Sequence, residues 1–144
     1  MLRILIAEDD LTSRVFLSKF LSRYGACDMV ADGVKAIDAC KAALDEGEPY
    51  DLICLDIMMP KVDGVKVLKA IREMENQKRI DTGKKSKIIM TTALAEAQFV
   101  QNAFDYGCEA YASKPIDLNK MVEVMERLGL IEKSLGGASK GSED

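Results

Sequence analysis

Apolar runs of strand length alternate with amphipathic segments along most of the chain. The runs predict buried strands at residues 2–7, 27–31, 52–56, 88–90 and 110–113. In the segments that follow them, apolar residues recur at helical spacing, which predicts helices at residues 11–24, 34–44, 65–76, 95–106 and 118–131. Strand and helix therefore alternate five times, and this order predicts an α/β fold with a parallel, doubly wound sheet.

The same spacing predicts which side of each helix faces the core. The predicted buried faces consist of Val15, Phe16, Phe20 and Leu21 in the first helix, Val34, Ile37, Cys40 and Leu44 in the second, and Val65 and Leu68 in the third. Gly25 is expected to cap the C-terminal end of the first helix, because glycine readily adopts the left-handed conformation found there.

The last predicted helix carries two apolar stripes. One stripe consists of Leu118, Val122 and Met125, and the other of Met121, Val124, Leu128 and Ile131. A helix packed on a sheet needs only one such stripe. The second stripe, together with Phe99 and Val100, could therefore form a partner or dimer surface; a wide buried face is the alternative.

Composition limits the class of protein. The 144 residues suit one domain, and 48% hydrophobic with 31% charged residues is ordinary for a soluble globular protein. A net charge of -4 disfavours nucleic-acid binding, which requires a basic surface. The chain has no apolar run of about 18 residues for a membrane span, and its first strand meets acidic residues too early for a signal peptide. These features predict a cytoplasmic protein.

Cysteine and histidine usage narrows the chemistry further. The four cysteines show no C-x-x-C spacing, so buried free thiols are expected in place of disulfides or a zinc site. The chain has no histidine, which excludes histidine as a general base, a metal ligand or a phosphorylated intermediate on this chain.

Two polar segments interrupt the pattern. Residues 76–87 lack apolar periodicity and predict an exposed loop, whose five basic residues could be a partner patch or simply solvated. Residues 132–144 are small and polar, which predicts a flexible tail after a domain at residues 1–131.

Polar residues gather at the expected carboxyl ends of four strands. They are Glu8, Asp9 and Asp10 after the first strand, Asp56 at the end of the third, Thr92 at the end of the fourth and Lys114 after the fifth. In isolation, Asp56 could equally be a helix cap or a turn residue. In a parallel sheet these ends share one edge, where carboxylates, a hydroxyl and an ammonium suit Mg²⁺ and a phosphoryl group. Asp56 would then be the nucleophile of a phosphoryl transfer.

These motifs together resemble the receiver domain of two-component response regulators, over about residues 2–131. The resemblance rests on Glu8-Asp9, Asp56 with Pro60, Asp63-Gly64, Thr92-Ala93 and Lys114-Pro115. It implies a flavodoxin-like sheet with strand order 2-1-3-4-5, as in the chemotaxis receivers. It also implies Mg²⁺-dependent transfer, with Mn²⁺ as a possible substitute, from a phosphohistidine on a sensor histidine kinase or phosphotransfer protein to Asp56.

The resemblance assigns roles within the site. Mg²⁺ would be held by Asp9, Asp56 and the backbone carbonyl of Met58, with Glu8 acting through water. Lys114 would pair with Asp56 before phosphorylation and with the phosphoryl group afterwards. No such role falls to Asp10, which is expected to cap the following helix.

It also assigns a switch and neighbours of the phosphoryl group. Thr92 would move toward the phosphoryl group while Tyr111 turns inward. Met58, Ala93 and Leu94 would flank that group. Because the side chains of Met58 and Leu94 cannot orient an attacking water, slow hydrolysis is expected.

Three functions follow as hypotheses. The first is a stand-alone receiver that signals to a protein target or homodimer through its last two helices and last strand, since no output domain fits after Ile131. The second is a phosphorelay intermediate or phosphate sink. The third is a Mg²⁺-dependent aspartyl phosphatase. Such enzymes resemble the motif D-x-D-x-T, which has a second aspartate two residues after the nucleophile, but this chain has Met58 at that position. Under the first two hypotheses the chain is not an enzyme. The only reactions expected of it are self-phosphorylation from small donors and slow self-dephosphorylation.

Overall fold

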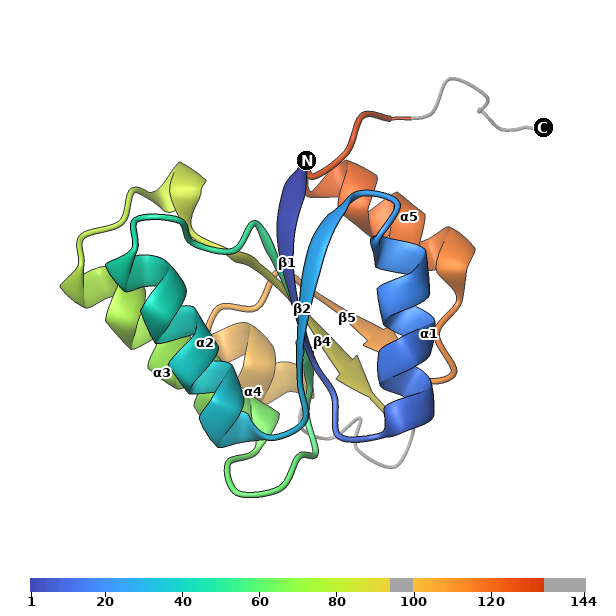
Figure 1. The fold of residues 1–144 in the computed structure, drawn as a ribbon, viewed down its shortest axis with the longest axis horizontal. Helices are drawn as coiled ribbons and strands as arrows, with labels where there is room; N and C mark the ends of the chain where they lie inside the picture. The colour runs from blue at the N-terminus through green and yellow to red at the C-terminus, as the bar shows by residue number, and fades with distance from the viewer. Residues whose placement is uncertain (94–99, 134–144) are drawn as a thin grey trace.

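Five parallel strands form one sheet in the order β2-β1-β3-β4-β5, as expected (Figure 1). The computed structural model describes residues 1–93 and 100–133, and the strands lie within these ranges. They are β1 (Leu2–Ala7), β2 (Gly25–Val30), β3 (Leu52–Asp56), β4 (Lys87–Thr92) and β5 (Ala110–Ser113). Strands β1 and β3 pair in register from Ile4 with Leu52 to Ala7 with Leu55.

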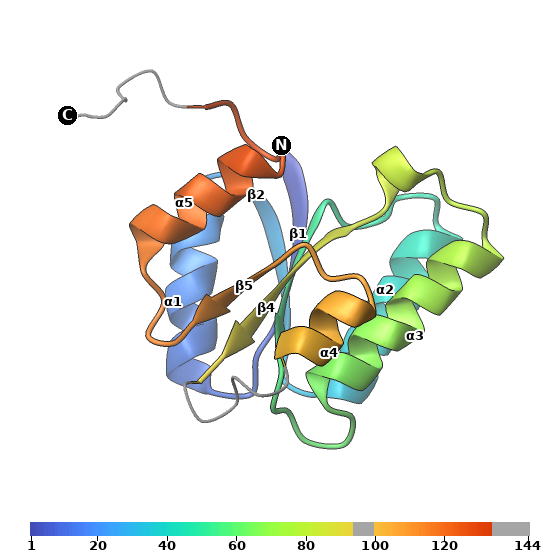
Figure 2. The ribbon, with the colours of Figure 1, turned by 180° about the vertical axis from the view of Figure 1, so that it is seen from behind.

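Helices cover both faces of this sheet. They are α1 (Leu11–Leu21), α2 (Gly33–Asp45), α3 (Gly64–Gln77), α4 (Val100–Asp105) and α5 (Leu118–Arg127). Helices α1 and α5 lie on one face and α2, α3 and α4 on the other (Figures 1 and 2). The predicted start of the fourth helix, at residues 95–99, lies outside the described residues. No helix in the described part of the chain combines the length and apolarity needed to cross a membrane.

The central strand explains the two apolar layers of the core. Every residue of β3 is buried. Ile53 and Leu55 belong to the core beneath α2, α3 and α4, whereas Leu52 and Cys54 belong to the core beneath α1 and α5. Side chains alternate between the faces of a strand, so a strand covered on both faces must be apolar at successive positions.

The predicted buried face of α1 was partly wrong. Val15 and Phe16 are 40% and 44% exposed, and Leu17 is buried in their place. Apolar residues at 15, 16, 17, 20 and 21 form overlapping stripes, so spacing alone did not select the side that faces the sheet.

The predicted end of α1 was also wrong. The helix ends at Leu21, and Gly25 is the first residue of β2, paired with Leu2. A Cβ atom at position 25 would collide with the carbonyl oxygen of Leu2. Glycine is therefore required there for close strand pairing and not for helix capping.

The other helices follow their predicted faces with local changes. In α2, Val34 is exposed, while the small residues Ala36 and Ala43 are buried. In α3, Val67 and Leu68 are buried and Val65 is only partly so.

Helix α5 buries a wide apolar face. Met121 and Met125 are fully buried, and Leu118, Val122 and Val124 are partly buried against the same core. The helix ends at Arg127 and not at the predicted residue 131, but Leu128 and Ile131, which follow it, also pack against this core. Among the described residues this favours the wide buried face over an exposed second stripe. Phe99, which was grouped with that stripe, lies outside the described residues.

The polar segment at 76–87 is more structured than predicted. It contains a 3-10 helix at Thr82–Lys84, and Ser86 is buried. The backbone N–H of Ser86 donates to Glu75 Oε2 at 2.9 Å, and its hydroxyl donates to the carbonyl of Tyr50 at 2.7 Å. These bonds attach the end of the segment to α3 and to the loop before β3.

The cysteines have the predicted state. All lie in described regions and are free: Cys40, Cys54 and Cys108 are buried, and Cys27 is partly buried. Burial raises the pKa of the Cys54 thiol to about 12, so this group is neutral at physiological pH and packs as a small apolar residue.

Candidate functional site

Asp56 is the last residue of β3 and lies almost completely buried at the carboxyl edge of the sheet. The chain then loops through Pro60 and returns so closely that the N–H of Gly64 donates to the carbonyl of Ile57 at 2.7 Å. A Cβ atom on residue 64 would collide with the carbonyl oxygen of Asp56. The tight loop after Asp56 therefore requires glycine at this position.

An acidic cluster forms around Asp56. Single carboxylate oxygens of Glu8, Asp9 and Asp56 all lie within 4.8 Å of one another. Glu8 is 1% exposed and Asp9 is exposed, so one carboxylate lies deep in the cluster and another at its rim. Glu8 Oε2 accepts a bond from the backbone N–H of Asp10 at 3.0 Å, which fixes its orientation.

Asp10 stands apart from this cluster, as expected. Its side chain accepts from the backbone N–H of Ser13 at 2.8 Å and caps the N-terminus of α1. This hydrogen bond is the main reason why the pKa of Asp10 is lowered. The predicted role as a helix cap is confirmed.

Lys114 bridges the two buried carboxylates. Its ammonium nitrogen lies 2.8 Å from Glu8 Oε1 and 3.1 Å from Asp56 Oδ2. The backbone N–H of Lys114 also donates to the carbonyl of Thr92 at 2.8 Å, and a cis peptide joins Lys114 to Pro115. The resemblance implied the pair with Asp56, but sequence reasoning missed the pair with Glu8.

The site is short of positive charge. Burial raises the pKa of Asp56, the facing Glu8 carboxylate raises it further, and Lys114 opposes both effects. Burial lowers the pKa of Lys114, but the ion pairs with Glu8 and Asp56 outweigh it, so that pKa is raised. Three carboxylates with one ammonium leave an excess negative charge, which a divalent cation would relieve. Oxygen ligands of this kind suit Mg²⁺.

Residues of the loop after β3 border this cluster. The backbone N–H of Met58 donates to Asp56 Oδ1 at 3.3 Å, and the Met58 side chain is exposed. Ala93 is partly buried at the end of β4. Leu94, the other predicted neighbour of the phosphoryl group, lies outside the described residues.

The two predicted switch residues lie on the same face of the sheet but point to different environments. Thr92 is buried and its hydroxyl donates to the carbonyl of Ala93 at 3.0 Å. Tyr111 is 49% exposed, and its ring contacts that of Phe104 in an edge-to-face arrangement. The structure therefore holds Tyr111 in an outward position.

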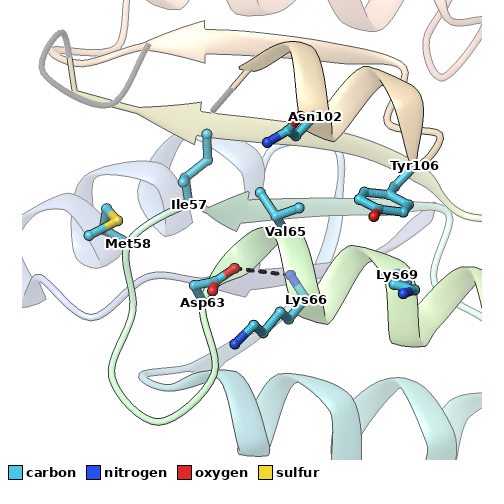
Figure 3. A pocket seen from close by; sticks show the side chains of 8 residues that line it. All are labelled: Ile57, Met58, Asp63, Val65, Lys66, Lys69, Asn102 and Tyr106. Atoms are coloured by element: carbon cyan, nitrogen blue, oxygen red, sulfur yellow. Dashed lines mark hydrogen bonds between the residues drawn. The ribbon is translucent and has the colours of Figure 1, made fainter. Parts of the chain in front are cut away.

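A groove of about 520 Å³ lies beside the loop that carries Met58 (Figure 3). Its lining residues are Ile57, Met58, Asp63, Val65, Lys66, Lys69, Asn102 and Tyr106. Ile57 and Val65 provide apolar surface, and the ammonium of Lys69 lies 5.4 Å from the centre of the Tyr106 ring. The groove joins residues from the loop after β3, from α3 and from α4 with the residue that follows it, so no local sequence pattern could indicate it.

Exposed apolar residues lie on α1, the helix that begins just after Glu8 and Asp9. We call Leu11, Val15 and Phe16 the α1 patch; they are exposed, and Leu11 follows Asp10 directly. Sequence reasoning assigned Val15 and Phe16 to the core and so missed this surface. An apolar patch beside a polar site is typical of a protein contact surface.

Comparisons with known proteins agree with this geometry. The family model of the response regulator receiver domain matches residues 4–126. The chain is 31% identical over 134 residues to probable histidine kinase 2 from Oryza sativa subsp. indica, a match that covers 86% of this chain but only 12% of that protein. It is 30% identical over 123 residues to chemotaxis protein CheY from Treponema pallidum (strain Nichols), covering 84% of this chain and 78% of that protein.

A solved structure gives the same result. The fold matches the receiver domain of a sensor histidine kinase from Pseudomonas aeruginosa PAO1 with a TM-score of 0.71 and 26% identity, covering 88% of this chain and 96% of that one. That structure is described as having a magnesium ion coordinated in its active site cleft.

Proposed function

Because the chain belongs to the family of response regulator receiver domains, we propose that it accepts a phosphoryl group on Asp56. The donor would be a phosphohistidine on a sensor histidine kinase or a histidine phosphotransfer protein. One observation carries the proposal: Lys114 bridges Glu8 and Asp56 inside an acidic cluster that still has excess negative charge.

The transfer would proceed at the carboxylate of Asp56. One of its oxygens attacks the phosphorus atom, a P–O bond forms, and the P–N bond to the donor imidazole breaks with its electron pair remaining on nitrogen. Lys114, already 3.1 Å from Asp56 Oδ2, would exchange this partner for a phosphoryl oxygen. The backbone N–H of Met58 would remain near the carboxylate that it now contacts.

The acidic cluster is the proposed Mg²⁺ site. Asp9, Asp56 and the Met58 carbonyl would hold the ion, with Glu8 acting through water; when bound, it neutralises charge on the phosphoryl oxygens. When all three carboxylates are ionised, the cluster and Lys114 together carry two net negative charges, which match a divalent cation; Mn²⁺ could replace Mg²⁺.

The α1 patch is the proposed contact surface for the phosphodonor. A donor imidazole must approach the acidic cluster from solvent, and Leu11, Val15 and Phe16 provide exposed apolar area beside that entrance. We place the protein in the cytoplasm, because its free buried thiols fit a reducing compartment.

The signal would leave through the last two helices and the last strand. Thr92 would turn its hydroxyl from Ala93 toward the phosphoryl group, and Tyr111 would turn inward. The resulting change in the surface of α4, β5 and α5 would then alter binding of a protein target or a second copy of the chain. In this scheme the chain is a signalling domain at residues 1–131 followed by a tail. Its only reactions would be self-phosphorylation from small donors and slow self-dephosphorylation.

One observation favours a second candidate, a phosphorelay intermediate. The chain spans only 12% of the histidine kinase that it matches at 31% identity, so receivers of this kind occur inside longer kinases. In that role it would pass the phosphoryl group on and need no output surface.

A direct test is incubation with acetyl phosphate and Mg²⁺, followed by intact mass measurement. We expect one added phosphoryl group in the wild type and none in Asp56→Asn. No gain with any phosphodonor would refute the proposal. Binding of candidate partners with and without the phosphoryl mimic beryllofluoride then separates the output domain, whose binding changes, from the relay intermediate.

A further inference from the structure

Phe104 on α4 is in direct contact with the proposed switch residue Tyr111. The ring centroids are 6.1 Å apart at an interplanar angle of 85°, an edge-to-face pair. Both rings are partly exposed, at 40% and 49%. The contact therefore lies at the surface, and it holds the Tyr111 ring in its outward position.

The backbone between these rings is held by one partly buried guanidinium. Arg72 donates from Nε and Nη2 to the carbonyl of Gly107, at 3.0 and 2.7 Å. Its Nη2 also lies 2.9 Å from Glu109 Oε1, and its Nη1 lies 2.8 Å from the fully buried Glu75. Gly107 follows Phe104 by three residues, and Glu109 precedes Tyr111 by two. Arg72 on α3 thus anchors the segment that joins Phe104 to Tyr111.

An inward movement of Tyr111 would separate the rings. Tyr111 pairs with Met90 in the sheet, and Thr92 lies two residues beyond Met90, so Tyr111 and Thr92 project from the same face. Helix α4 covers this face through Ala103, a small, fully buried residue of the same core cluster as Met90. Because Arg72 holds the backbone, Tyr111 can approach Thr92 only by rotating away from Phe104.

We propose that Phe104 is a positioning residue that stabilises the outward conformation of Tyr111, and that phosphorylation of Asp56 must break this contact. The inference rests on the proposed function. Phe104 would thereby shift the equilibrium between outward and inward Tyr111 toward the outward, resting state in the unphosphorylated protein. The usual strength of an edge-to-face pair corresponds to a change of about two- to tenfold in this equilibrium.

The test is the affinity of the Mg²⁺-loaded protein for beryllofluoride, measured for the wild type, Phe104→Leu and Phe104→Tyr. Leucine keeps apolar bulk without the ring, so Phe104→Leu is expected to bind about two- to tenfold more tightly. Phe104→Tyr keeps the ring and should bind like the wild type. In a Tyr111→Leu background, Phe104→Leu should give no further tightening, because the partner ring is already absent.

Ring-to-ring nuclear Overhauser effects supply a second readout. The chain has only four phenylalanines and four tyrosines, so selective labelling can resolve the Phe104–Tyr111 cross-peak. We expect this cross-peak in the free protein and its loss on beryllofluoride binding. Equal affinity of the wild type and Phe104→Leu, or a cross-peak that persists, would overturn the role of Phe104. Absence of beryllofluoride binding by the wild type would instead overturn the proposed function.

Discussion

The ammonium of Lys114 lies 2.8 Å from Glu8, closer than its 3.1 Å contact with Asp56. The lysine therefore serves two buried carboxylates and neutralises neither completely. With Asp9 in the same cluster, one ammonium faces three carboxylates, a donor set that suits the proposed divalent cation.

Glu8→Gln should weaken Mg²⁺ binding by about tenfold, because it removes one negative charge from the cluster and leaves Lys114 to neutralise Asp56. Titration calorimetry measures this directly. Asp38→Asn is the matched control, since it removes the same charge from an exposed residue of α2 outside the cluster. Equal losses of affinity in both variants would show that only net charge matters.

Asp56→Asn should stabilise the metal-free protein, with a pH dependence set by the raised pKa of Asp56. Burial and then Glu8 raise this pKa to about 8, so the folded state binds the proton more tightly than the unfolded chain does. The contribution of Asp56 to wild-type stability is therefore most favourable below the ordinary pKa of aspartic acid and is lost as the pH rises toward about 8.

The variant lacks this titration. We expect it to exceed the wild type by at least about 1 kcal/mol in unfolding free energy at pH 9, with a smaller difference at pH 5. Urea unfolding with a chelator measures both values. A difference that grows as the pH falls would contradict the assignment.

Arg72→Met should destabilise the fold by about 3–5 kcal/mol, because it leaves Glu75 buried without its cationic partner. Chemical unfolding of the variant measures this loss. Adding Glu75→Gln should recover much of it, since the unpaired buried charge is then removed while the amide oxygen can still accept from the Ser86 N–H. Lys41→Met, which breaks the exposed pair with Asp45, is the control and should change stability little.

The topology could be predicted because alternation of strand and helix, with polar residues at strand ends, is a local signal. It predicts that Asp56, Glu8, Lys114 and Thr92 share one edge of the sheet, where the parallel strand order brings them together. By contrast, the buried side of α1 could not be selected from five closely spaced apolar residues.

Features that depend on distant pairs were also missed. Arg72 meets Glu109 across 37 residues, and Tyr111 meets Phe104 across a change of element. Periodicity reports which residues are buried, and it carries no signal for which distant side chains meet.

Phe16→Ser should slow phosphoryl transfer from a protein donor by about tenfold and leave labelling by acetyl phosphate unchanged, because the α1 patch would contact only the protein donor. The donor is a purified histidine phosphotransfer domain that labels the wild type. Met29→Ser, which alters a similarly exposed apolar residue on β2, should leave both reactions unchanged. If Phe16→Ser slows acetyl phosphate labelling equally, the residue supports the site and not the donor contact.

Met58→Asn should shorten the lifetime of the phosphoryl group on Asp56 by about tenfold. The exposed side chain of Met58 lies two residues beyond Asp56 and offers an attacking water no hydrogen-bond partner, whereas an amide there could orient one. Loss of the added mass after removal of acetyl phosphate gives the lifetime, and Met29→Asn controls for the general effect of an exposed amide. In the wild type the label should persist for minutes. Its loss within seconds, or an unchanged lifetime in Met58→Asn, would mean that the side chain at position 58 does not limit access of water to the phosphoryl group.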